Sequence, residues 1–375
     1  MDELEKSPEI QSSKPTDFIS EEKGTLIAAE LSDPTSYLQE SEQQAGQIRK
    51  QQSAPAISPW RETLEIFLQD WRTKASFIVL GFFVLLALAG PPIYQHIGTS
   101  YTSDVDEQTY NAAAMHSYSH EELDRQDELP SAQYWLGTDQ LGRDILARLM
   151  QGMLISLAIC ISVAIVDFGL GLLIGLLAAY YGGMIDQLLA RFTDLIFAFP
   201  GLLFLIMVAG IFGPVLDNAF NNVPIIGNGG GRALIIFLCL ALFVWPSTAR
   251  LVRGQALQLK QQQFIEAAHT TGTSDKGIIW RHIMPNLLSI AIFSVVLDMV
   301  GTITGEAGIS VLGIGIQPPG SSIGLMISDA SPYVATHPWE LMVPTTALTI
   351  IVLAFAFLGD AFQDAFDPQG KKQQG

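Results

Sequence analysis

The fold class that the sequence predicts is an all-α membrane protein with six transmembrane helices. Of its 375 residues, 49% are hydrophobic and only 15% are charged, whereas soluble domains carry about 25% charged residues. Six apolar runs approach the roughly 20 residues that a spanning helix needs. Because open sheet edges cannot face lipid, these runs are expected to be helices. They cover about 77–97, 153–181, 192–213, 232–250, 283–305 and 341–360.

The first 59 residues are polar and acidic. They hold eleven acids against five bases and few large apolar residues, a composition typical of a disordered tail. The first apolar run begins only near Phe77, so we expect no cleaved signal peptide. The predicted division is an acidic tail (1–59), the region of the first span (60–98), an extracytoplasmic loop with an amphipathic lead-in (99–150), a core that contains the remaining five spans (151–368) and a short C-terminal tail (369–375).

Basic residues predict the orientation in the membrane. Segment 98–150 has ten acids against three bases, and the loops 214–231 and 306–340 contain acids but no base. Cytoplasmic loops carry the excess of Lys and Arg. We therefore expect a multi-pass plasma-membrane protein with both termini in the cytoplasm. The bases that carry this prediction are Arg61, Arg72, Lys74, Arg250, Arg253, Lys260, Lys276, Arg281, Lys371 and Lys372.

Between the fourth and fifth spans lies a polar, helix-forming stretch on the predicted cytoplasmic side. Gly272 is placed as a helix stop, Ser274 can cap a second short helix, and Pro285 suits the first turn of the fifth span. The pattern predicts two short helices at an angle on the inner membrane face. Their expected apolar side consists of Phe264, Ile265, Ala268, Ile278 and Ile279.

The segment "GTDQLGRD" (137–144) imitates a phosphate-binding loop through Gly137 and Gly142. Arg143 and Asp144 stand where that loop needs Lys and Ser or Thr, so a turn leading into the second span is the preferred interpretation. The acidic net charge of −17 also makes the chain a poor candidate for nucleic-acid binding, which requires a basic face.

Metal and disulfide sites have little support in the sequence. His116 and His120 would share a helix face, a possible metal arrangement, but a solvated outer-loop face is the preferred interpretation. Cys160 and Cys239 both lie in apolar runs and form neither a disulfide framework nor a zinc site.

Asp167 and Asp298 interrupt apolar spans. Acids inside a membrane are costly and indicate a pathway or a proton site; the alternative is an inward-facing acid satisfied by a neighbouring helix or a partner subunit. No Ser-His-Asp arrangement, HExxH or Walker motif is present, so the sequence predicts neither a membrane enzyme nor an ATP site.

The stretch "EAAHTTGTSDKGIIWRHIMPN" (266–286) resembles the EAA loop of bacterial ABC importer permeases. Met284 stands where Leu is usual and His269 where Arg is common. The positions that match the family pattern are Glu266, Ala267, Ala268, Gly272, Ile283 and Pro285.

Further segments resemble the C-type subunits of dipeptide, oligopeptide and nickel importers in the same order along the chain. They are "WLGTDQLGRDILARLMQG", "YYGGMIDQLLARFTDLIFAFPGLLFLI", "GEAGISVLGIGIQPPGSSIGLMI" (with Ile323 in place of the usual Trp) and "LGDAFQDAFDP". The resemblance covers about residues 60–368, and leaves out the acidic tail and the enlarged loop at about 98–130.

The resemblance implies a type I ABC importer permease with six transmembrane helices and a cytoplasmic coupling helix at about 262–274. It implies four kinds of partner: a homologous B-type permease, two ABC ATPases, an extracytoplasmic solute-binding protein and a peptide substrate. ATP and Mg would be bound by the ATPases and no cofactor by this chain. Glu266 would hold a base of the ATPase or cap a backbone amide; both options remain open.

Rival functions follow from the same residues. Permeases for nickel or another small solute look alike, since specificity resides in the binding protein. A membrane scaffold or interaction protein could use the acidic tail, but would have no use for the EAA stretch. A membrane enzyme is the weakest alternative, because no catalytic constellation is present.

Overall fold

The computed structural model describes residues 67–104, 107–220 and 230–366. These residues belong to one compact unit, Thr63–Gly375. The predicted acidic tail (1–59) and C-terminal tail (369–375) lie outside the described residues.

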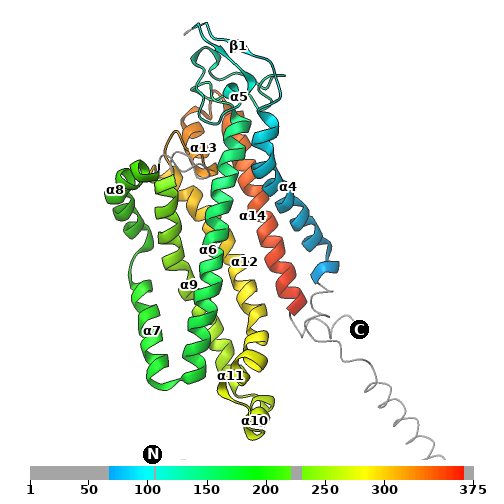
Figure 1. Ribbon diagram of the computed structural model, residues 1–375, viewed down its shortest axis with the longest axis vertical. Coiled ribbons are helices and arrows are strands. Elements are labelled where there is room, and N and C mark those ends of the chain that lie inside the picture. The colour runs from blue at the N-terminus through cyan, green and yellow to red at the C-terminus, as the bar shows by residue number, and fades with distance from the viewer. Residues whose placement is uncertain (1–66, 105–106, 221–229, 367–375) are drawn as a thin grey trace, which may run out of the picture. The chain divides into compact units, whose positions relative to one another are not determined.

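The described chain is almost entirely helical (Figure 1). The one sheet among the described residues is a pair of two-residue strands. In it, β1 pairs antiparallel with β2, and Tyr101 lies opposite Tyr110. The elements are α4 (Trp71–Tyr94), β1 (Tyr101–Thr102), β2 (Thr109–Tyr110), α5 (Ala112–Met115), η1 (Leu123–Arg125), α6 (Ile145–Tyr181), α7 (Gly183–Ala198), α8 (Gly201–Phe220), α9 (Gly230–Lys260), α10 (Gln263–Thr270), α11 (Asp275–Ile278), η2 (Ile279–Ile283), α12 (Met284–Val311), α13 (Ile323–Ala330), η3 (Ser331–Tyr333) and α14 (Pro338–Phe366).

Six helical segments in the described ranges are long and apolar enough to cross a membrane, which confirms the predicted number. They are α4, α6, α8, α9, the continuous segment Asp275–Val311 and α14. Several extend beyond the apolar runs, because charged and polar residues at helix ends still form backbone hydrogen bonds. Glu306 is the clearest correction: it was assigned to an acidic outer loop but lies within α12.

The predicted third span, 192–213, is wrong as a single helix. The chain leaves the helical conformation at Phe199, whose ψ is 131°, and Pro200 follows. A residue before proline is driven out of the α region by the proline ring. The run is thus divided between the end of α7 and most of α8, and α7 carries the exposed Met184, Leu188 and Leu195.

The centre of the helix bundle is α6, which packs most extensively against α9 and also against α12 and α4. Small residues bring α6 and α9 close together: a Cβ on Gly171 would lie 2.6 Å from Thr248, and one on Gly175 would lie 2.5 Å from the carbonyl oxygen of Ala249. Close backbone approach through small residues is the usual way in which membrane helices associate.

At one end of the bundle, the described residues between 95 and 144 form a folded cap over the ends of α4 and α6 (Figure 1). The buried side chains of Met115 and Tyr134 form its interior. The α10–α11 hairpin lies at the opposite end of the bundle (Figure 1).

Candidate functional site

The α10–α11 hairpin contains the residues of the EAA pattern. Gly272 follows α10 with φ +79°, a left-handed conformation that glycine adopts without a steric penalty. The Thr273 N–H donates to the Ala268 carbonyl oxygen at 3.0 Å, as expected after a helix that ends at a glycine. The Ser274 hydroxyl accepts a hydrogen bond from the Gly277 N–H at 3.4 Å. The predicted stop at Gly272 and cap at Ser274 are confirmed.

One face of α10 is buried against two spanning helices. Ile265 is 1% exposed, and with Ala268 it packs in an apolar cluster to which α9 and the α11–α12 segment also contribute. Phe264, by contrast, was assigned to the apolar side but is 45% exposed. The neighbours of Ile265 and Ala268 in this cluster include Val252, Ala256, Ile278, Ile279 and Ile283.

The opposite face of α10 is open. Glu266, Ala267 and Gly272 are all exposed. Among the described residues, the Glu266 carboxylate has no hydrogen-bond or ion-pair partner, and Gln262 makes no side-chain cap at the start of α10. Of the two roles left open for Glu266, capping a backbone amide of this chain is therefore not observed.

Polar contacts tie the hairpin to the end of α6, and the end of α6 to the end of α9. The Tyr180 hydroxyl donates to Asp275 Oδ1 at 2.7 Å, and Lys260 Nζ donates to the Tyr180 carbonyl oxygen at 2.6 Å. The Lys260 ammonium also lies over the Tyr180 ring, 5.5 Å from its centroid. The first contact joins the hairpin to α6, and the two Lys260 contacts join the end of α9 to the same residue of α6.

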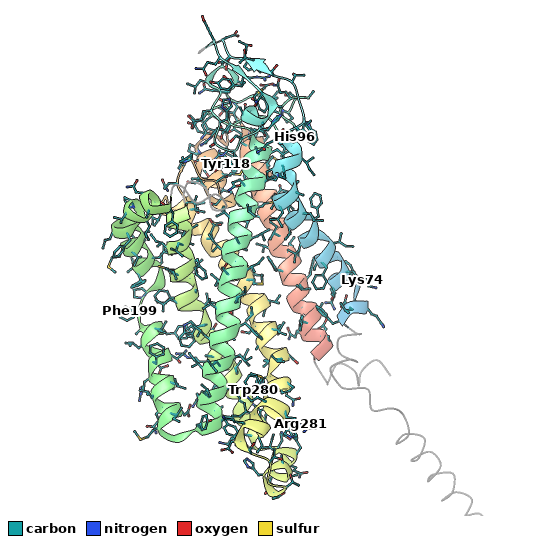
Figure 2. All side chains as sticks on the ribbon, in the orientation of Figure 1. Lys74, His96, Tyr118, Phe199, Trp280 and Arg281 are labelled. Atoms are coloured by element: carbon teal, nitrogen blue, oxygen red, sulfur yellow. The ribbon has the colours of Figure 1, made fainter. Side chains whose placement is uncertain are left out.

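The sequence predicted that the second short helix would be separate from the fifth span. Instead, α11 continues into that span through a π-helical turn, η2. Pro285 has no N–H and its ring would clash with the carbonyl of Arg281 in a regular α-helix. The Met284 N–H instead reaches the Ile279 carbonyl, five residues back, and Asn286 Nδ2 donates to the His282 carbonyl at 2.6 Å. Trp280 and Arg281 are exposed (Figure 2).

Asp167 and Asp298 lie near each other inside the bundle, on α6 and α12. The Thr248 hydroxyl, from α9, lies between them and donates to Asp298 Oδ2 at 3.2 Å, and it is 3.2 Å from Ser294 Oγ. Asp167 is fully buried, and neither of its carboxylate oxygens meets hydrogen-bond geometry with a described residue. Sequence spacing gave no sign that these residues, from three helices, would meet.

Glu306 is a buried acid that the sequence analysis missed. It is 1% exposed and accepts hydrogen bonds from Ser156 Oγ at 2.8 Å and Ser310 Oγ at 3.0 Å. Its position within an otherwise small and apolar stretch, "GEAGIS", is the signal that could have placed it in a helix.

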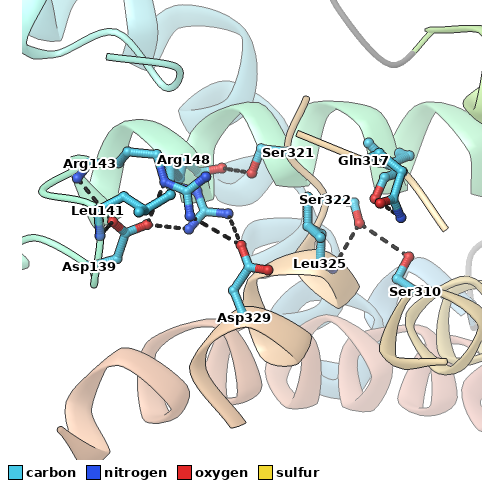
Figure 3. Close-up of polar contacts among 11 residues, drawn as sticks. Asp139, Leu141, Arg143, Arg148, Ser310, Gln317, Ser321, Ser322, Leu325 and Asp329 are labelled. Carbon is cyan, nitrogen blue, oxygen red and sulfur yellow. Dashed lines mark hydrogen bonds and ion pairs between the residues drawn. The ribbon is translucent and has the colours of Figure 1, made fainter. Parts of the chain in front are cut away.

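The segment that imitates a phosphate loop forms a turn held by ion pairs (Figure 3). Asp139 Oδ2 pairs with Arg143 Nε at 2.8 Å and with Arg148 Nη1. Arg148 Nη2 also lies 2.7 Å from Oδ2 of Asp329, which belongs to α13. A Cβ on Gly142 would come within 1.8 Å of the Glu122 carbonyl oxygen. The glycine thus serves a close backbone contact, and both arginines are paired internally.

The solvated face expected for His116 and His120 is wrong for His116. Its side chain is 1% exposed and its Nδ1 lies 2.7 Å from Asp144 Oδ2, while Asp144 also caps the start of α6. His120 instead lies beside Glu122, with Nε2 3.3 Å from Oε2. The two imidazoles therefore face different carboxylates.

A further hydrogen bond organises the outer part of the cap. The Tyr101 hydroxyl donates to Asp124 Oδ2 at 2.6 Å. This bond, together with partial burial and the negative charge of Asp124, raises the pKa of Tyr101 to about 12.

An apolar cavity of about 550 Å³ opens between α8, α9 and α12. Leu202, Phe243 and Ile309 are among its lining residues, with Gly305 and Gly308 on the α12 side. Its wall contains almost no polar surface, so it suits apolar contacts rather than ionic recognition.

Comparison with known proteins gives a consistent result. Residues 171–372 match the family model "Binding-protein-dependent transport system inner membrane component". The glutathione transport system permease protein GsiD of Pectobacterium atrosepticum is 36% identical over 84% of this chain and 92% of its own length. The dipeptide transport system permease protein DppC of Bacillus subtilis is 30% identical over 88% of this chain and 91% of its own.

A third relative, the oligopeptide transport system permease protein OppC of Mycobacterium tuberculosis, is 34% identical over 68% of this chain and 83% of its own length. With six spanning helices and a family match over more than half of its residues, the chain is a multi-pass inner-membrane protein. It belongs to the family of binding-protein-dependent transport system inner membrane components, the permeases of type I ABC importers.

Proposed function

We propose that this chain forms half of the translocation pathway of an ABC importer for peptides, with both termini on the cytoplasmic side. The names of its relatives, permeases for glutathione, dipeptides and oligopeptides, support the substrate class. A homologous B-type permease would form the other half, a solute-binding protein would deliver the peptide, and two ATPases would bind ATP and Mg. No cofactor is proposed for this chain itself.

The observation that carries this proposal is the two-sided character of α10. Its inner face, with Ile265 and Ala268, is buried against α9 and the α11–α12 segment. Its outer face, with Glu266 and Ala267, is exposed. We assign α10 as the coupling helix, whose outer face docks in a cleft of one ATPase and whose inner face transmits the motion.

The apolar contacts of α10 give a route by which motion of the ATPase would reach the spanning helices. When ATP binding moves the ATPase cleft, a docked α10 moves with it, and its buried side chains carry α9 and α12 along. Rotation of packed helices as rigid bodies between two states is a common switching mechanism. Glu266 makes no internal contact that docking would have to break, so it is free to pair with a base of the ATPase.

Asp298 and Asp167 are proposed as polar residues of the pathway. Asp298 is partly exposed on α12 and is bonded to Thr248 on α9, two helices that the motion of α10 would displace. Asp167 is its buried companion on α6. Asp298→Asn should reduce uptake while leaving insertion unchanged; unaltered uptake would remove Asp298 from the pathway.

The coupling assignment is tested with Gly272→Leu in the reconstituted complex. The left-handed backbone at Gly272 would cost a leucine roughly 1–2 kcal/mol and change the angle between α10 and α11. We expect loss of substrate-stimulated ATP hydrolysis with normal membrane insertion. The matched control is Gly254→Leu on α9, where nothing lies within 4 Å of the added Cβ and no left-handed conformation is needed. Normal stimulation in Gly272→Leu would overturn the assignment.

The substrate class is tested by uptake of labelled dipeptides, oligopeptides, glutathione and nickel into cells that carry the complete transporter. Peptide uptake that requires this chain supports the proposal. Nickel uptake without peptide uptake would replace it with the small-solute alternative.

A further inference from the structure

Three potential metal ligands meet where the cap touches the start of α14. Asp127 comes from the cap, His337 directly precedes α14, and Glu340 lies in its first turn. His337 Nδ1 lies 3.6 Å from Asp127 Oδ1 and 3.9 Å from Glu340 Oε1. Among the described residues, this is the one group of three or more His, Cys, Asp or Glu side chains with ligand atoms within 4.8 Å of one another.

Glu340 is the residue that calls for an explanation. It is 3% exposed, and neither of its carboxylate oxygens has a hydrogen-bond partner among the described residues. Asp127 Oδ1 is likewise buried and without a hydrogen bond. A buried carboxylate without a partner is costly, and buried polar groups in native proteins are nearly always satisfied.

Among the described residues, no arginine or lysine forms an ion pair with these oxygens. The positive charge of Arg148 acts on Glu340 electrostatically, but its guanidinium is already paired with Asp139 and Asp329. Two carboxylates facing one imidazole therefore leave an excess of negative charge and several unused lone pairs at the same point.

The backbone also holds Asp127 in an uncommon conformation. Its φ is +54°, which non-glycine residues rarely adopt outside turns and functional sites. Its N–H donates to the Asp139 carbonyl oxygen at 3.1 Å, so the Asp139 turn fixes the position of the Asp127 carboxylate. On the other side, the Trp339 ring lies edge-on to the His337 ring at 5.2 Å between centroids, while Thr336 Oγ1 lies 3.4 Å from Nδ1.

We propose that Asp127, His337 and Glu340 bind a divalent transition-metal cation, with zinc as the best-fitting ion. One imidazole nitrogen and two carboxylate oxygens are a ligand set that zinc accepts, with bonds of about 2.0–2.2 Å. In a tetrahedral site such bonds separate the ligand atoms by about 3.4 Å. The two measured separations, 3.6 and 3.9 Å, need to close by only a few tenths of an ångström, and water would fill the fourth position.

The ion would join the cap to the sixth spanning segment. Asp127 belongs to a loop without a regular element of its own, whereas His337 and Glu340 belong to the start of α14. A metal bridge would keep the loop attached to the start of α14. The site is separate from the α10 end of the molecule and does not depend on the transport assignment.

The test uses the full-length chain in lipid nanodiscs, purified with a tag free of histidine because polyhistidine itself binds zinc. After removal of metal with a chelator and dialysis against zinc sulfate, bound zinc is counted by mass spectrometry and its affinity is measured by calorimetric titration. We expect one zinc per chain. Removing a ligand should cost more than the 10–100-fold typical of residues that only orient ligands, so His337→Gln and Glu340→Gln should weaken zinc binding at least about 100-fold.

His96→Gln is the matched control, because His96 is exposed at the same end of the molecule and should leave zinc binding unchanged. The melting temperature (Tm) provides a second readout: zinc should raise it in the wild type but not in Glu340→Gln, whose Tm in chelator shows whether the variant is folded. Absence of stoichiometric zinc in the wild type, or equal affinity in folded His337→Gln, would overturn the proposal.

Discussion

The two ends of the bundle use polar residues in opposite ways. In the turn at 139–148, buried acids and bases are paired with one another: Asp139 alone accepts from Arg143, Arg148 and two backbone N–H groups. At the other end, Glu266 on α10 is exposed and has no partner among the described residues. The difference indicates that the cap is built to hold itself together, whereas the hairpin keeps one face for another molecule.

The two ends are also attached to the bundle by different kinds of contact. The turn at 139–148 is joined to Asp329 by ion pairs between buried arginines and a carboxylate, while α10 is seated mainly through apolar side chains. Ion pairs fix a geometry and are costly to break. An apolar seat depends on contact area and tolerates small sliding movements. The free energy of unfolding should therefore depend most on the cap. The coupling between a bound partner and the spanning helices should depend most on the hairpin.

The largest effect is expected from Asp139→Asn. Arg143 and Arg148 are 3–4% exposed in their side chains, and removing the charge they share leaves two buried cations with Asp329 as their one remaining carboxylate partner among the described residues. We expect a loss of about 3–5 kcal/mol, measured as the free energy of unfolding of the purified chain in detergent. Asp194→Asn is the control, because its pair with Arg250 is about half exposed and should cost less than about 1 kcal/mol. Equal losses would contradict the comparison.

An intermediate effect is expected from Ile265→Ala in the seat of α10. The side chain is 1% exposed, and a cavity at such a position costs about 2–5 kcal/mol. The loss should be local, so hydrogen exchange of the α10 amides should accelerate while the cap remains protected. Phe264→Ala, at a position 45% exposed, should leave exchange unchanged. Faster exchange throughout the bundle would show that the hairpin is not a separate unit.

The smallest effect is expected from the Tyr101–Asp124 hydrogen bond in the cap. Its loss in Tyr101→Phe should cost about 1 kcal/mol at neutral pH. Since the folded-state pKa of Tyr101 is raised to about 12 from about 10 in the unfolded chain, this contribution is complete below pH 10 and disappears as the pH rises through 12. The Tm difference between wild type and Tyr101→Phe should thus shrink over that window. A Tm difference that does not change with pH would show that the Tyr101–Asp124 hydrogen bond does not make this contribution.

Local signals in the sequence predicted the parts of the fold that depend on neighbouring residues. Apolar runs located the spanning helices, and Gly272 and Ser274 located the ends of the two short helices, because a left-handed glycine and a capping hydroxyl act within a few residues. The break at Pro200 belongs to the same class and was available from the "FP" dipeptide, but the apolar run across it outweighed that signal.

Contacts between distant segments could not be predicted in this way. Thr248 meets Asp298 across 50 residues, Arg148 meets Asp329 across 181, and Asp127 meets His337 at the base of the cap. Each depends on how the helices pack, and periodicity along one helix says nothing about which face another helix covers. The burial of Glu306 and His116 was missed for the same reason.

The widened turn at η2 has a consequence for how the protein would sit in a bilayer. It turns the side chains of Trp280 and Arg281 outward while Ile279 and Ile283 stay buried. Tryptophan and arginine are residue types that settle at the headgroup level of a bilayer. At that level the two residues would set how far α10 stands from the lipid surface, and a change in bilayer thickness, which tilts or shifts spanning helices, would move α10 relative to the protein that binds it. The lipid composition of the membrane would thereby influence how α10 meets its partner.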